Sequence, residues 1–191
     1  MKRSLLLALL AWGCFAATAT AEAYRVKPLD EPAPSDDVAP AIAAQLAPAG
    51  VAVMRSETST LCNIWLCKEW PVAAGFKPSA EVLYPFASGQ LIGVLQLKRS
   101  SGDFRDQDIG RGVYTLRYAQ QPVDGNHVGT SKTRDFLLLV SAEEDRAAEP
   151  LDLEKMIAAS KEAAESSHPA MLALQAIAGD VDKTPAIREN A

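Results

Sequence analysis

Histidine and cysteine are scarce in this sequence, and several signatures of catalysis are missing. The 191 residues include two histidines and three cysteines, with no HxH, HxxxH or CxxC pattern. The usual sequence signals of a zinc or redox site are therefore absent. No GxSxG elbow, phosphate-binding glycine loop or dinucleotide fingerprint is present either. We expect no cofactor and no metal, and the sequence leaves open whether the protein is an enzyme.

Positive charge is also limited. The chain has 19 Lys and Arg residues against 24 Asp and Glu residues, which gives a net charge of −5. No Lys/Arg block stands out, so the charge pattern gives no support to nucleic-acid binding. Hydrophobic residues make up 48% of the chain and charged residues 23%. This composition is ordinary for a soluble globular protein, and the length suits one domain.

The first 23 residues have the pattern of a cleavable signal peptide. Lys2 and Arg3 precede an apolar stretch at 4–17, and small residues allow cleavage after Ala21 or Ala23. The apolar run is shorter than the roughly 20 residues that a membrane span needs. The sequence therefore predicts export to the periplasm or the medium, without a transmembrane span.

A lipid anchor on Cys14 is the less favoured alternative. Gly13 precedes this cysteine, as in a lipoprotein cleavage box. Ala11 stands where such boxes prefer a leucine-like residue, and Trp12 is bulky.

Cysteines 62 and 67 would remain in an exported chain, where disulfides are common. The segment 61–68 has the composition of a strand. Positions five apart in a strand are separated by about 16 Å, at about 3.3 Å per residue. A disulfide needs Cα atoms within about 7 Å. We therefore favour two unpaired thiols, Cys62 and Cys67.

The remaining chain is predicted to be mainly β, an antiparallel sandwich or open barrel with two peripheral helices. We expect a proline-rich linker at 24–36, a single β-rich domain at 37–179 and a flexible tail at 180–191. The helices are expected at 37–46 and 152–166. Alternating or continuous apolar patterns predict strands near 51–53, 61–68, 82–86, 91–97, 112–118 and 136–140, with 171–174 as a strand or helical turn.

Two long loops hold most of the chemically interesting residues. The loop at 99–111 contains Asp103, Asp106 and Asp108, which offer oxygens to calcium, although their spacing does not match a calcium-binding loop. A solvated loop held by Asp–Arg pairs is the alternative. One strand separates this loop from the loop at 121–133, so we expect the two at opposite ends of the sheet.

The loop at 121–133 is the preferred site. Its candidate ligand-binding residues, together with nearby ones, are Asp124, Asn126, His127, Arg134, Asp135 and His168. The alternative is structural: a turn at 124–126, a packing role for His127, a helix break at His168 and an ion pair between Arg134 and Asp135.

The stretch GVYTLRY at 112–118 and the loop residues Asp124, Asn126 and His127 resemble a family of exported bacterial proteins of unknown function. Ser167-His168-Pro169 fits the same resemblance. The family implies an exported single domain and assigns no catalytic residue.

Two functional hypotheses remain. The first is an exported, non-catalytic β module that binds a protein or a cell-envelope polymer. The second is a metal-dependent or hydrolytic enzyme with its site on the loop of Asp124 and His127.

Overall fold

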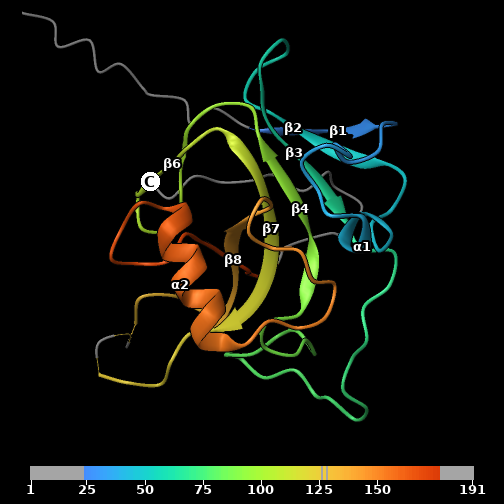
Figure 1. Cartoon of the computed structure of the whole chain (residues 1–191). Helices are drawn as coiled ribbons and strands as arrows, with labels where there is room; N and C mark the ends of the chain where they lie inside the picture. The colour runs from blue at the N-terminus through green and yellow to red at the C-terminus, as the bar shows by residue number, and fades with distance from the viewer. Residues whose placement is uncertain (1–23, 126, 128, 177–191) are drawn as a thin grey trace, which may run out of the picture.

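A seven-stranded antiparallel sheet forms the body of the protein (Figure 1). The computed structural model describes residues 24–125, 127 and 129–176. In spatial order the strands are β1 (Arg25–Leu29), β2 (Gly50–Met54), β3 (Thr60–Leu66), β4 (Leu91–Leu97), β7 (Gly112–Gln120), β8 (Asp135–Ser141) and β9 (Met171–Ala173). A separate hairpin pairs β5 (Ser101–Gly102) with β6 (Asp108–Ile109). The predicted mainly β, antiparallel fold with two helices is confirmed, and the sheet is open.

Both helices pack against one face of the sheet, here called the helix face. Helix α1 (Pro40–Ala43) buries Ile42 against Trp65 and Val94 of β3 and β4. Helix α2 (Leu153–Ala163) buries Met156 against apolar side chains of β8. Figure 1 shows α2 across the front of β7 and β8 and α1 beside β3.

The two helices differ in how well the sequence predicts them. The carboxylate of Asp152 accepts hydrogen bonds from the backbone N–H groups of Glu154 and Lys155, so this residue caps α2, which begins at the start of the predicted range 152–166. Helix α1 is much shorter than the predicted 37–46. Pro40 disfavours helical geometry in the residue before it, so the helix begins at Pro40.

The opposite face of the sheet carries the largest apolar cluster, which includes Leu95, Leu116, Tyr118 and Leu139. The predicted strand at 82–86 is wrong. The segment crosses this face, so its backbone cannot join the plane of the sheet. Tyr84 and Phe86 pack on the cluster, and Phe86 meets the ring of Tyr118 edge-on at 5.5 Å between centroids.

The domain boundaries need one correction. Residues 25–29 of the predicted linker form β1, because Val26 and its neighbours pair with β2. The sheet therefore begins before the predicted boundary at residue 37. The expected signal peptide at 1–23 and tail at 180–191 lie outside the described residues. Neither helix of the described residues has the length and apolar character of a membrane span.

Cys62 and Cys67 are free, as predicted, and both are buried. Cys62 belongs to the cluster on the face opposite the helices, whereas Cys67 packs with Ile42 and Trp65 on the helix face. Burial raises the pKa of the Cys62 thiol to about 12. Burial also raises the pKa of Cys67 to about 11, against a smaller lowering by Arg117.

Candidate functional site

The predicted site loop carries one close pair of polar side chains. His127 Nδ1 lies 2.6 Å from Asp124 Oδ1, and the two side chains are 34% and 44% exposed. The hydroxyl of Thr130 donates to the carbonyl of His127, which closes the turn. Asn126 lies outside the described residues.

Asp135 is a structural residue of the core. It is fully buried, and its two oxygens accept hydrogen bonds from the Tyr118 hydroxyl and the backbone N–H of Leu83. Desolvation raises the pKa of Tyr118, and the hydrogen bond to Asp135 raises it further. Asp135 therefore anchors the irregular segment at 82–86 to the sheet.

Arg134 does not pair with its neighbour. Its guanidinium donates to the carbonyl of Gln121 at 2.9 Å, and no salt bridge joins it to Asp135 in the described part of the chain. The predicted ion pair is therefore wrong. Arg134 precedes β8 and bonds to Gln121, whereas the carboxylate of Asp135 is engaged by the Tyr118 hydroxyl and the Leu83 N–H.

His168 is exposed in the turn after α2, and its backbone N–H donates to the hydroxyl of Ser166. Within residues 24–125, 127 and 129–176, no group of three His, Cys, Asp or Glu side chains is arranged to hold a metal ion.

Asp103 serves the folding of the first loop. Asp103 is 8% exposed, and its carboxylate accepts four hydrogen bonds, from the backbone of Arg105, Gln107 and Met171 and from the Gln107 amide. These donors occupy the oxygens that calcium would need. The loop is therefore held by backbone N–H groups and an amide, rather than by the Asp–Arg pairs considered above.

The two long loops also meet, contrary to the expectation that they lie at opposite ends of the sheet. The β5–β6 hairpin folds back along β9, where the Phe104 N–H bonds to the Met171 carbonyl. A hollow of about 410 Å³, here called the loop pocket, joins them. Its lining comprises Phe104, Gly129, Thr130, Ser131, Lys132 and Gln175.

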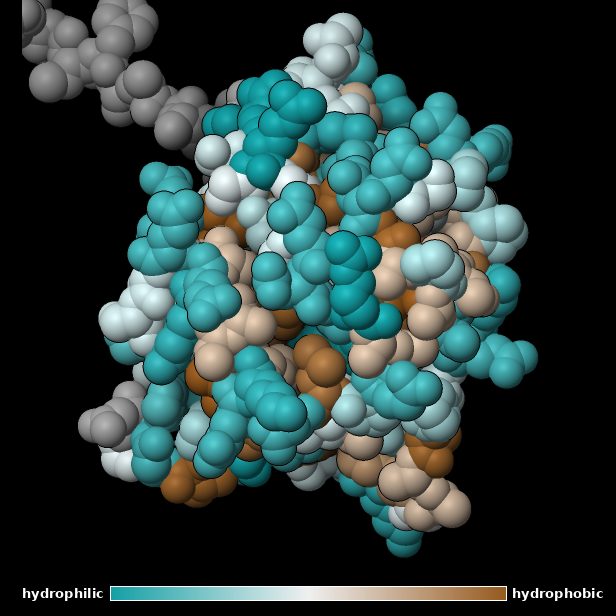
Figure 2. All heavy atoms as spheres, in the orientation of Figure 1, coloured by the Kyte–Doolittle hydropathy of each residue, from teal (hydrophilic) through white to brown (hydrophobic). Residues whose placement is uncertain are grey.

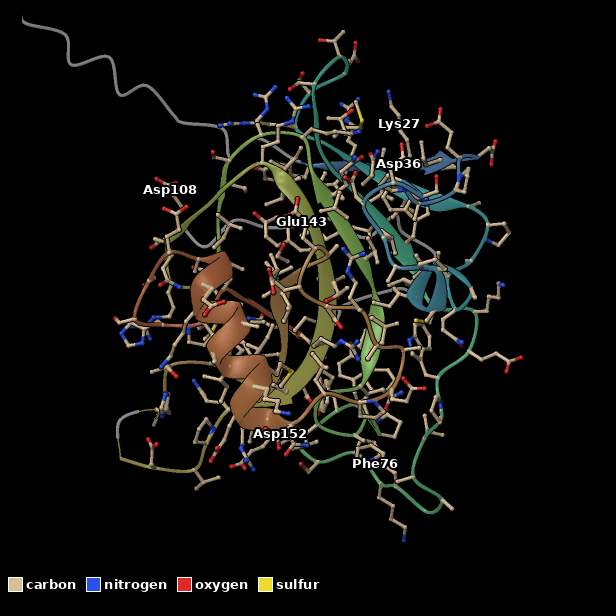
Figure 3. The ribbon with its side chains drawn as sticks, viewed as in Figure 1. Lys27, Asp36, Phe76, Asp108, Glu143 and Asp152 are labelled. Atoms are coloured by element: carbon tan, nitrogen blue, oxygen red, sulfur yellow. The ribbon has the colours of Figure 1, made fainter. Side chains whose placement is uncertain are left out.

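A larger hollow of about 580 Å³, here called the sheet groove, lies on the helix face. Gln96 and Val113 are cross-strand partners in its floor, and α2 contributes Ala159, Glu162 and Ala163 to one wall. Figure 2 shows hydrophilic side chains around the hollowed centre of this face. In Figure 3, Glu143 lies in front of the sheet between α2 and the segment that carries Asp36.

Sequence reasoning missed the sheet groove because its lining comes from distant segments of the chain, including Asp37, Gln96, Arg111 and Glu162. The alternation in β7 indicated which residues share a face. No local pattern indicated which segments cover that face, or which part of the face stays uncovered.

Comparisons with models of protein families, with curated proteins and with solved structures found no match. The resemblance to a family of exported proteins therefore stays a prediction.

Proposed function

We propose that this protein is an exported, non-catalytic binding module that holds an extended, basic segment of a partner protein in its sheet groove. The observation that carries the proposal is an open groove whose charged side chains have no partners of their own. Four are acidic and two are basic, a balance of 2 − 4 = −2: Asp37, Glu143, Glu144, Glu162, Lys98 and Arg111.

All six of these side chains are exposed, and none forms a salt bridge with another described residue. Their charges are therefore available to a ligand. Exposed ion pairs contribute only about 0.2–1 kcal/mol each. Several such pairs along one groove are needed for useful affinity, and an extended chain with repeated basic groups can supply them.

Beside the floor of the groove lies a buried side-chain amide whose oxygen lacks a hydrogen bond from the described residues. Asn63 is the cross-strand partner of Gln96 on the helix face and is 7% exposed. Its Oδ1 atom has no hydrogen-bond partner within residues 24–125, 127 and 129–176. A buried amide without a partner is costly, and most such groups in proteins are satisfied. A ligand backbone or ammonium that reaches this end of the groove would offer a donor.

Charge favours a protein partner over an anionic polymer of the cell envelope. The whole chain has a net charge of −5, and the groove adds a local excess of carboxylates. A polymer rich in phosphate or carboxylate groups would be repelled by both. Basic side chains would be attracted, and electrostatic attraction also speeds encounter.

The test uses pentalysine as the probe and the purified protein. We expect saturable binding that weakens steeply with added salt, because exposed charges are screened beyond about 10 Å at 0.1 M salt. Replacing Glu143, Glu144 and Glu162 by Gln should reduce affinity about tenfold, if each pair contributes about 0.5 kcal/mol.

A matched variant, with Glu69, Glu81 and Glu154 replaced by Gln, removes the same charge from exposed positions that do not line the groove. Its affinity for pentalysine should stay within about twofold of the parent. Equal losses in both triple variants would mean that net charge attracts the probe, and would refute the groove. Absence of binding to the parent would refute it as well.

A second candidate function is hydrolysis. The close contact between Asp124 and His127 favours it, because a carboxylate on Nδ1 orients an imidazole for general-base catalysis. Ser131 lies four residues further on, but its hydroxyl forms no hydrogen bond with the imidazole. Turnover of p-nitrophenyl acetate that is lost in His127→Ala and in Asp124→Asn would support this function. Equal turnover in both variants and the parent would exclude it.

A further inference from the structure

The loop pocket brings together three segments that are far apart in the sequence. Phe104 comes from the β5–β6 hairpin, residues 129–132 from the loop after β7, and Gln175 from the segment after β9. The pocket is separate from the sheet groove and shares no lining residue with it.

Hydrogen bonds and ring packing fix the wall that carries Phe104. Its backbone N–H donates to the Met171 carbonyl at 2.9 Å, and the Met171 N–H donates to Asp103. The ring of Phe104 meets that of Phe136 edge-on, with 5.1 Å between centroids. This wall is therefore set before any ligand arrives.

The opposite wall is also fixed by local bonds. Thr130 donates to the His127 carbonyl and accepts from the Gln121 amide at 2.8 Å. Thr133, the residue after the pocket segment, donates to the Leu174 carbonyl beside Gln175. The threonine hydroxyls of this segment thus serve the fold.

Ser131 is the exception. Its Oγ atom is buried and has no hydrogen-bond partner in the part of the chain that the structure describes. A buried hydroxyl without a hydrogen-bond partner costs stability. A ligand group that bonds to this hydroxyl in the pocket would remove that cost. Lys132 and Gln175 are exposed in the same pocket, and neither side chain has a partner among the described residues.

We propose that the loop pocket binds one sugar unit of a carbohydrate. A sugar ring offers an apolar C–H face to the ring of Phe104. Its hydroxyls both donate and accept, which matches Ser131, Lys132 and Gln175 together. A purely apolar ligand would leave Ser131 without a partner. A simple anion would use the ammonium of Lys132 but neither the aromatic ring nor the amide. This site is independent of the proposed function.

The experiment follows backbone amide shifts of the ¹⁵N-labelled protein during titration with glucose, N-acetylglucosamine and glucuronate. At least one of the three sugars should give saturable shifts confined to Phe104, residues 129–132 and Gln175. Ser131→Ala should weaken that sugar's binding about fivefold, because one net hydrogen bond is lost. Its melting temperature should equal or exceed that of the parent, because the hydroxyl forms no hydrogen bond with another described residue.

Ser160→Ala is the matched control. Ser160 is fully buried, and its hydroxyl donates to the Ala170 carbonyl at 3.0 Å. This variant should melt earlier and bind the sugar unchanged. Phe104→Leu keeps an apolar side chain but removes the ring, and should also weaken binding.

Two results would overturn the proposal. One is the absence of localised shifts with all three sugars. The other is unchanged sugar affinity in Ser131→Ala, whose folding does not depend on the hydroxyl.

Discussion

Arg117 and Asp145 form a fully buried salt bridge, in which the guanidinium donates from Nε and Nη2 to the two carboxylate oxygens at 2.7 and 2.8 Å. Thr115 donates to the same carboxylate, and the guanidinium also bonds to the carbonyls of Gly89, Ala147 and Glu149. This network fastens the connection between β8 and α2 to the helix face.

We expect Asp145→Ala to lower the free energy of unfolding by about 3–5 kcal/mol, because Arg117 would remain buried without a counter-charge. Urea unfolding measures the change. Glu57→Ala removes an exposed partner of Arg25, in a pair with side chains 66% and 83% exposed, and should cost at most about 1 kcal/mol. Similar losses in the two variants would contradict the assigned role of Arg117.

The start of β7 supports a second prediction. The Tyr114 hydroxyl donates to the Gly110 carbonyl at 2.8 Å, which ties the start of β7 to the preceding corner. Tyr114→Phe should lower the free energy of unfolding by about 1 kcal/mol. Tyr84→Phe serves as the control, since the Tyr84 hydroxyl has no hydrogen-bond partner among the described residues. A larger loss for Tyr84→Phe in urea unfolding would argue against the corner.

Alkaline pH should destabilise the fold through Cys62. Its pKa rises from 9.0 to about 12 because burial disfavours the thiolate, so the folded chain holds this proton more tightly than the unfolded chain. The corresponding stability is complete below pH 9 and is lost as the pH rises towards about 12. The loss should be about 1.4 kcal/mol per pH unit within that interval.

Urea unfolding of the parent and of Cys62→Ala at several pH values tests this effect. The difference in free energy of unfolding between the two proteins should be constant below pH 9 and should shift in favour of the variant above it. A difference that does not change with pH would show that Cys62 does not contribute.

The burial of Tyr24 favours one of the two expected cleavage sites. Tyr24 is 5% exposed and belongs to the core cluster. Cleavage after Ala23 would place a new α-ammonium group on this buried residue, which is costly. Cleavage after Ala21 would keep the charge two residues away. If the expected signal peptide is removed, the intact mass of the mature protein should correspond to a chain that starts at Glu22, and a start at Tyr24 would contradict this expectation.

The sequence predicted the elements whose local pattern and tertiary environment agree. The alternation in β7, the apolar run in β8 and the apolar stripe of α2 each specify one structure without distant partners. The unpaired state of Cys62 and Cys67 followed from strand geometry in the same way. Prediction failed where the structure of a segment depends on a distant part of the chain. The alternating residues at 82–86 predicted a strand, but they pack across the sheet, and the Leu83 N–H is bonded to Asp135.

The same distinction between local pattern and distant packing applies to the candidate site. The sequence by itself determined a mainly β chain and two polar loops, with Asp124 and His127 as candidate residues on the second, because turns and strands depend on neighbouring residues. Only the tertiary structure decided that Asp135 is buried, that Phe104 joins the second loop and that acidic residues surround a groove on the helix face. Burial and pockets depend on which distant segments pack together, and no local pattern records that packing.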